Sequence, residues 1–303
     1  MKRVLFALGL GLATGWVQAV CAPSQGLAVE VLGSGGPIAD DARAGSSYLI
    51  WLDGRARVLI DVGGGSFLRF GEAAARIEDL ELIALTHLHA DHAADLPALI
   101  KSSYFSQRKR PLTISGPDAG ADFPGLSEWL QALFDARRGA WRYLAGALDG
   151  SAGQFALLPK EIVAASRKPV TVFDAAGLRV EAIGVPHGPV PALAYRVSVG
   201  GRRLVFGGDQ NGSADWFWKF ARRADLLVMG LAIPEHADPV ARGLHAPPGV
   251  IGAGAGRAEV RGLLLSHLME RSLYSLDANL AALRRGYTGP LTVAQDLACL
   301  PGP

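Results

Sequence analysis

The sequence predicts a layered α/β protein in which β-sheets lie inside and helices lie outside. Half of the 303 residues are hydrophobic and 19% are charged, which provides a sizeable core and excludes a disordered chain. Two hairpin patterns, each followed by an alternation of helix and apolar strand, select this class among globular folds. We find no low-complexity linker and no short tandem repeat, and expect residues 20–303 to form one domain.

Residues 1–19 are typical of a secretory signal peptide. Lys2 and Arg3 precede an apolar stretch, and small residues follow it, with a suitable cleavage site after Ala19. The apolar stretch is shorter than the roughly 20 residues that span a bilayer. An uncleaved anchor, or a lipoprotein modified at Cys21, are the alternatives. We expect a periplasmic or secreted protein with no membrane span after cleavage.

The mature chain carries little net charge. Removal of residues 1–19 removes two positive charges and no negative ones, so the formal net charge falls from +2 to 0. Charge therefore indicates neither nucleic acid nor membrane as a partner. The cysteines Cys21 and Cys299 lie near opposite ends of the mature chain and could pair in an exported protein. Neither belongs to a C-x-x-C motif, which argues against a cysteine metal site.

The first half of the chain opens with a hairpin pattern at residues 46–65. Two β-rich runs meet at Asp53-Gly54, a dipeptide typical of two-residue hairpin turns. The run "LELIALTH" (80–87) predicts a buried strand. We interpret residues 117–170, rich in helix signals and aromatic residues, as a helical insertion over the domain.

The second half repeats this design. A hairpin pattern at residues 193–209 turns at Gly200-Gly201, and "DLLVMGLA" (225–232) predicts the next buried strand. The runs "RGLLLSH" (261–267) and "GPLTVAQD" (289–296) predict further short strands. Across both halves, helices are expected over residues 72–77, 92–107, 126–138, 213–223, 252–260 and 276–284.

Imidazole groups are concentrated at the end of the strand predicted at 80–87. Three of the seven histidines, His87, His89 and His92, fall within six residues, with Asp91 between the last two. Alternate strand residues share a face, so His87 and His89 project together from the strand end. Asp91 and His92 open the next helix and approach from another direction. This arrangement suits two nearby metal ions, and the ligand types favour zinc, with iron or manganese as alternatives.

The motif "THLHADH" resembles the central motif of the metallo-β-lactamase-fold hydrolases. The resemblance extends from about Val29 to Asp296 and implies a four-layer αββα sandwich. Asp61 in "LIDVGGG" matches an aspartate that supports the site without binding metal. The remaining ligands implied by the resemblance are His187 in "VPHGP", Asp209 in "FGGDQ" and His267 in "LLLSHL".

The resemblance implies two zinc ions per chain. One ion would be held by His87, His89 and His187, and the other by Asp91, His92 and His267, with Asp209 bridging both. The implied mechanism is attack on an ester bond by a hydroxide shared between the ions. Asp91 would orient this hydroxide while also binding metal.

Within this superfamily the chain resembles the ribonuclease Z and arylsulfatase-like branch. True β-lactamases lack an aspartate at the position of Asp209. His245 matches a histidine of the branch, since it lies 22 residues before the last ligand (267 minus 245) and precedes a helix signal. We predict that His245 is catalytic, giving a proton or hydrogen bond to the leaving group or a substrate oxygen. A loop or helix-capping histidine is the alternative.

These features predict an exported dinuclear zinc hydrolase that cleaves a phosphodiester, aryl sulfate or similar ester. The alternatives are a lactonase of the same fold and a non-catalytic metal-binding protein. The chain lacks a convincing counterpart of the flexible arm with which ribonuclease Z grips transfer RNA, and its leader directs it away from transfer RNA processing. We therefore expect a small-molecule ester substrate and consider nucleic acid an unlikely partner, with a homodimer left open.

Overall fold

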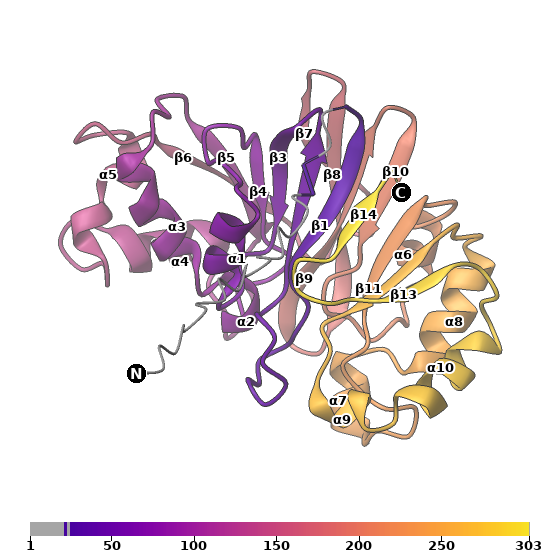
Figure 1. Cartoon of the computed structure of the whole chain (residues 1–303). Helices are drawn as coiled ribbons and strands as arrows, with labels where there is room; N and C mark the ends of the chain where they lie inside the picture. Colours follow the sequence, from indigo (N-terminus) through magenta and orange to yellow (C-terminus); the bar gives the residue numbers. More distant parts are fainter. Residues whose placement is uncertain (1–20, 23–24, 303) are drawn as a thin grey trace, which may run out of the picture.

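The computed structural model describes residues 21–22 and 25–302, and shows two seven-stranded sheets packed face to face with helices on their outer sides (Figure 1). This arrangement confirms the predicted αββα sandwich. The signal peptide predicted for residues 1–19 lies outside the described residues. In the part of the chain that is described, no helix is long and apolar enough to cross a bilayer.

The first sheet contains the strands of the first half and one C-terminal strand. Its order is β14-β1-β2-β3-β4-β5-β6, in which β3 to β6 are parallel. The turn predicted between β2 and β3 is confirmed, because Asp53 and Gly54 have φ angles of 50° and 74°, as a tight hairpin turn requires. The strands are β1 (Leu27–Gly33), β2 (Ser47–Leu52), β3 (Arg55–Ile60), β4 (Leu82–Ala84), β5 (Leu112–Pro117), β6 (Leu157–Ile162) and β14 (Cys299–Pro301).

The second sheet repeats the pattern in the second half. Its order is β13-β12-β11-β10-β9-β8-β7, and β10 to β13 are parallel. The predicted turn at Gly200 and Gly201 is confirmed, with φ angles of 56° and 78°. The strands are β7 (Val170–Ala175), β8 (Leu178–His187), β9 (Val190–Val199), β10 (Arg202–Phe206), β11 (Leu226–Gly230), β12 (Leu263–Ser266) and β13 (Leu291–Val293).

Three apolar clusters stabilise the layers. One lies between the sheets, where residues such as Val31 and Leu82 of the first sheet meet Tyr195 and Leu264 of the second. The other two lie beneath the helices of each half. Because both sheets are covered on both faces, their central strands are almost entirely buried, which explains their continuous apolar runs.

The helices divide between the two outer faces (Figure 1). On the first sheet they are α1 (Ser66–Glu72), α2 (Ala90–Ala93), α3 (Leu96–Ser102), α4 (Leu126–Phe134) and α5 (Gly146–Asp149), with the 3₁₀ turns η1 (Ser103–Phe105) and η2 (Arg142–Leu144). On the second half they are α6 (Asp215–Phe220), α7 (Pro239–Leu244), α8 (Pro248–Arg257), α9 (Glu270–Leu273) and α10 (Leu276–Arg284).

Several predicted helix boundaries need correction. The helix expected at 72–77 is wrong, since α1 ends where that range begins. The helix expected at 92–107 is divided into α2, α3 and η1, with Pro97 starting a new helix in the first turn of α3. The segment 117–170 is helical only in its first part, because β6 extends the first sheet from within it.

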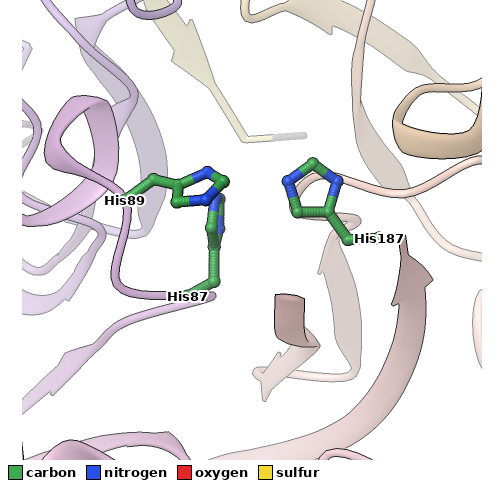
Figure 2. A group of neighbouring side chains, drawn as sticks. All are labelled: His87, His89 and His187. Carbon is green, nitrogen blue, oxygen red and sulfur yellow. The ribbon is translucent and has the colours of Figure 1, made fainter. Parts of the chain in front are cut away.

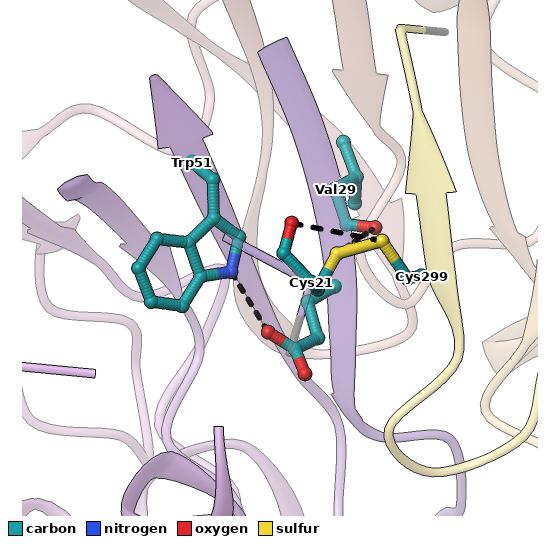
Figure 3. Close-up of a disulfide and its surroundings, with 5 residues drawn as sticks. Cys21, Val29, Trp51 and Cys299 are labelled. Atoms are coloured by element: carbon teal, nitrogen blue, oxygen red, sulfur yellow. Dashed lines mark hydrogen bonds between the residues drawn. A yellow bond between two sulfur atoms is a disulfide. The ribbon is translucent and has the colours of Figure 1, made fainter. Parts of the chain in front are cut away.

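A disulfide joins the two ends of the described chain. Cys21 and Cys299 are bonded, with their Cα atoms 5.4 Å apart and a sequence separation of 278 (Figure 3). Cys299 lies in β14, which pairs with β1. The bond therefore fixes the C-terminal strand to the edge of the first sheet.

Candidate metal centre

The candidate ligands follow the carboxyl ends of strands along one edge of the sandwich. His87 lies just beyond β4, His187 ends β8, Asp209 follows β10, and His267 follows β12. These strands run in the same direction within their sheets, so their carboxyl ends lie at a common edge. Residues more than 170 positions apart, such as Asp91 and His267, are brought within hydrogen-bonding distance by this topology.

One group of ligands consists of His87, His89 and His187. A nitrogen of each ring lies within 4.8 Å of the others. Figure 2 shows the three rings converging on a shared space, with His87 and His89 on one side and His187 on the other. His87 and His187 are buried, whereas His89 is half-buried. This is the set predicted to hold the first ion.

The second group consists of Asp91, His92 and His267. Asp91 Oδ2 lies 3.5 Å from His92 Nε2 and 3.1 Å from His267 Nε2. The rings of His92 and His267 are stacked, with centroids 5.3 Å apart. This set matches the residues predicted to hold the second ion.

Asp209 lies between the two groups. Its Oδ2 is 3.8 Å from His187 Nε2 in the first group and 3.2 Å from His267 Nε2 in the second. Its Oδ1 is 3.6 Å from His92 Nε2. A single carboxylate that lies within 4 Å of ligands from both groups, here through its Oδ2 atom, is placed as a bridging ligand needs.

Hydrogen bonds behind the ligands orient their rings. His92 Nδ1 lies 2.8 Å from Asp61 Oδ2, and Asp61 also accepts from the backbone N–H and hydroxyl of Thr86. His187 Nδ1 donates to the Leu244 carbonyl at 2.9 Å. In each histidine the other nitrogen, Nε2, is thereby directed into the cluster, as outer partners do for metal-binding imidazoles. Asp61 has the supporting position expected from the sequence.

The cluster fits a divalent cation. His87 Nε2, His92 Nε2 and His187 Nε2 are buried and have no hydrogen-bond partner among the described residues. Buried nitrogens are rarely left without a partner, and here they face carboxylates. Imidazole nitrogen combined with carboxylate oxygen is a donor set that zinc accepts.

Burial and neighbouring charges shift the pKa values of the candidate ligands toward the protonation states that bind metal. Burial lowers the pKa of the His87 ring well below its usual value, which keeps the imidazole neutral, as metal binding requires. Burial acts to raise the pKa of Asp209, but the neighbouring rings of His267 and His92 hold it well below the usual range. Asp209 is therefore ionised and can balance positive charge.

His245, predicted to be catalytic, lies beside the cluster. It follows the last residue of α7, and its Nδ1 is 3.7 Å from Asp209 Oδ2. Its ring centroid lies 5.4 Å from that of His187 and 5.3 Å from that of His267. Burial lowers the pKa of His245 to about 4, so the ring is neutral at pH 7 and can donate one hydrogen bond. Together with His187 and Asp209 it also forms a third potential ligand set.

Two neighbours were missed at the sequence level. Thr86 holds Asp61, and Phe123 lies with its ring centroid 6.1 Å from that of His89. Thr86 could have been found, since it begins the motif "THLHADH". Phe123 could not, because nothing near it in the sequence indicates the strand-end cluster.

Comparison with protein families identifies the fold at the level of the superfamily. The profile of the Metallo-beta-lactamase superfamily matches residues 40–240, which is more than half of the chain. The chain belongs to this superfamily. It is accordingly a metal-dependent hydrolase acting on phosphodiester or other ester bonds, and the resemblance noted from "THLHADH" is confirmed.

Relatives in the same superfamily are ribonucleases. The chain is 28% identical over 282 residues to ribonuclease Z of Mycobacterium avium, covering 89% of this chain and 96% of that one. It is 31% identical over 186 residues to ribonuclease Z of Mycobacterium marinum, where the match covers 60% of this chain and 62% of the relative. These matches confirm the ribonuclease Z side of the predicted branch.

Solved structures share the fold. The human short-form tRNase Z has a TM-score of 0.70 at 22% identity, with 91% of this chain and 99% of that chain covered. The metallo-beta-lactamase fold protein YhfI of Bacillus subtilis has a TM-score of 0.69 at 22% identity and the same coverage. At this identity the likeness establishes the fold alone.

The expected partners require correction. A small-molecule ester substrate, with nucleic acid as an unlikely partner, is the wrong expectation, because the matched relatives are ribonucleases. The wrong expectation was based on the absence of a recognisable arm and on the predicted leader, and neither feature concerns the groups that react with the substrate.

Proposed function

We propose that the protein is an exported dinuclear zinc phosphodiesterase that cleaves RNA. The observation that carries this proposal is the position of Asp209 between two groups of three ligands, within 3.8 Å of one and 3.2 Å of the other. The similarity of the chain to ribonuclease Z of Mycobacterium avium, over 89% of its length, favours an RNA phosphodiester over other esters as the substrate.

Two ions would suit this donor set better than one. The first group offers three imidazoles, and the second offers two imidazoles and a carboxylate. Zinc ions held there would supply an activated water and positive charge for the phosphoryl oxygens. Iron or manganese are alternatives with similar ligand preferences.

The chain's own groups would prepare the reaction. Asp91 Oδ2 is near both His92 and His267, so it can accept a hydrogen bond from the attacking water and fix its direction. His245, neutral at pH 7, can donate a hydrogen bond to a substrate oxygen or to the leaving group. His89 is only half-buried and has Phe123 beside it, so these two side chains are candidates for contact with the substrate.

Export is supported by the disulfide and the predicted leader. Stable disulfides are typical of the periplasm and extracellular space, and rare in reducing cytosol. Cys21 would be the second residue of the chain cleaved after Ala19, so its bond to Cys299 would form in the mature protein. The RNA substrate would then be one met outside the cytosol.

The proposal can be tested with mature protein, beginning at residue 20 and loaded with zinc. Cleavage of a single-stranded RNA oligonucleotide and of a chromogenic phosphodiester should depend on added zinc. Asp209→Asn should lower turnover about 100-fold or more, since even substitutions of the residues that support metal ligands typically cost 10- to 100-fold. Asp225→Asn is the control, because Asp225 is a buried carboxylate bonded to Arg203 N and arginines elsewhere in the second half. Failure of protein with two zinc ions to cleave any RNA would exclude the function.

The same assay distinguishes a catalytic role of His245 from a role as a metal ligand. His245→Ala should lower turnover while leaving two zinc ions per chain, measured by elemental analysis. Loss of zinc in this variant would make His245 a ligand, and undiminished turnover would leave it no part in catalysis.

A further inference from the structure

The glycine-rich loop at residues 34–45, between β1 and β2, packs against the second ligand group. A Cβ atom placed on Gly36 would lie 2.7 Å from Cε1 of His267. One placed on Gly45 would lie 2.7 Å from the carbonyl oxygen of Asp91. The loop thus contacts both segments that supply the ligands of this group, and at these two positions only glycine leaves enough space.

The loop is also bonded to the ligand segment through its backbone. Leu268 N, directly after His267, donates to the Ser34 carbonyl at 2.8 Å. Within the loop, Gly35 N donates to the Ala44 carbonyl at 2.8 Å. A chain rich in glycine has high conformational freedom and does not hold such a shape by itself. An external group has to fix the loop.

Asp296 supplies that group with a single carboxylate. Its Oδ1 accepts from Ser34 N at 3.0 Å and from Ser34 Oγ at 2.7 Å. Its Oδ2 accepts from Ala44 N at 2.9 Å. The two oxygens therefore bind the two ends of the loop and close it, although Asp296 lies 252 residues or more away in sequence.

Two arginines complete the contact. Arg43 Nη1 donates to Ser34 Oγ at 2.7 Å and to the Ala294 carbonyl at 2.9 Å. Arg69 Nε lies 3.5 Å from Asp296 Oδ2. These cations complement the carboxylate, which lies in the crossover from β13 in the second sheet to β14 in the first.

We propose that Asp296 is a positioning residue for the second metal. By closing the loop it keeps Gly36 against His267 and Gly45 against Asp91, and so holds both ligands in the orientation in which they face Asp209. In the described part of the chain, no hydrogen bond joins His87 or His89 to this loop, so the first metal should depend on Asp296 far less. The inference rests on the proposed dinuclear function.

Zinc affinity of the mature protein tests the inference without any substrate. In Asp296→Asn one oxygen becomes an N–H₂ group, which cannot accept from Ser34 or Ala44. We expect one zinc ion to bind as in the wild type and the affinity for the other to fall about 10- to 100-fold, as for other supporting residues. Competition with a chromogenic chelator measures both affinities. Asp225→Asn, which removes a buried carboxylate bonded to a backbone N–H in the other half, should leave both unchanged.

Two further measurements separate positioning from a general loss of structure. Hydrogen exchange should accelerate at residues 34–45 in Asp296→Asn but not in the β-strands of the second sheet. Turnover of the variant should recover as free zinc is raised, because the weakened second ion is then restored. Equal affinities in variant and wild type, or an equal fall for both ions, would overturn the inference. A wild type that binds two ions but cleaves no RNA would refute the proposed function and leave the role of Asp296 standing.

Discussion

At the scale of the residue, Glu30 is an unusual buried acid outside the metal centre. It lies in β1, is 3% exposed, and its Oε2 accepts from Trp51 Nε1 at 2.8 Å. Burial raises the pKa of Glu30 to about 7, which the Trp51 hydrogen bond only partly opposes. The protonated form is thus favoured in the folded chain relative to the unfolded one.

This shift predicts a pH-dependent effect of Glu30→Gln. The pKa of Glu30 is about 7 in the folded chain and has the ordinary value of 4.5 in the unfolded chain. Between these two pH values the folded state binds more protons, so the free energy of unfolding falls as the pH rises to about 7. Glutamine keeps an acceptor for Trp51 without a charge. The difference in free energy of unfolding between the variant and the wild type should therefore change by about 2 to 3 kcal/mol in favour of the variant when the pH is raised from 4 to 8.

Urea unfolding at the two pH values measures this gain. The partly exposed Glu181, paired with Arg196, provides the control substitution Glu181→Gln, which should show no such gain. A difference between Glu30→Gln and wild type that is the same at both pH values would contradict the assignment.

At this scale the sequence was informative where chemistry is concentrated in a motif. "THLHADH" indicated four residues of the cluster, and the family resemblance indicated His187, Asp209 and His267, which the structure brings close to them. Asp296 could not be found in this way. Its function depends on backbone N–H groups of a distant loop, and backbone groups leave no residue-specific signal.

At the scale of the element, α8 and α10 pack unusually closely. A Cβ atom on Gly252 of α8 would lie 2.0 Å from the Leu283 carbonyl oxygen of α10. A Cβ atom on Gly256 would lie 2.1 Å from the Gly286 carbonyl oxygen. The glycines in "GVIGAGAGR" therefore permit backbone contact between the helices, which outweighs their low helix propensity.

Gly252→Ala should consequently destabilise the protein. Alanine favours an isolated helix by up to about 1 kcal/mol over glycine, but overpacking at a backbone contact typically costs 1–3 kcal/mol. We expect a net loss of about 1–2 kcal/mol in the free energy of unfolding, measured by chemical denaturation. Gly71→Ala in α1, where a Cβ atom would meet nothing within 4 Å, should be neutral or stabilising. Equal behaviour of the two variants would refute the packing argument.

Helix boundaries could be predicted from the sequence only where the residues that start or end a helix agree with how the helix packs in the structure. α10 has the predicted bounds, whereas α8 begins four residues earlier than the predicted 252, at Pro248. Pro248 in the first turn indicates the start of α8, but the many glycines that follow it have a low helix propensity and led to a later predicted start. The helix expected to reach Arg138 ends at Phe134, because the Asp135 carboxylate accepts from Arg137 N and Arg138 N and forms a turn.

At the scale of the whole molecule, the C-terminal segment joins the two sheets. β13 belongs to the second sheet, and β14 pairs with β1 at the edge of the first. The disulfide between Cys21 and Cys299 then closes almost the whole described chain into a loop, with a sequence separation of 278 residues. Such a long loop restricts the unfolded chain strongly.

Removal of the disulfide should therefore lower stability. We expect Cys21→Ser with Cys299→Ser to lose about 2 to 5 kcal/mol in the free energy of unfolding. Reduction of the wild type should give the same loss, whereas reduction of the double variant should change nothing. An unchanged unfolding midpoint in reductant would show that the bond adds no stability.

The layered architecture was predictable because the two halves repeat one hairpin pattern, at Asp53-Gly54 and Gly200-Gly201. The pairing of β14 with β1 was not, because its three residues, Cys299–Pro301, are too few to show a strand period. The position of so short a strand depends on contacts with distant residues, here its pairing with β1 and the disulfide to Cys21.

The division of the ligands between the sheets has a consequence for how the protein acquires its ions. His87 to His92 come from the first sheet, while His187, Asp209 and His267 come from the second. Each of the two predicted sites combines ligands from both halves, so neither ion is fully coordinated until the two layers have met. A bound ion would then stabilise the contact between the two layers, and its removal would destabilise the packing of the sheets at that edge.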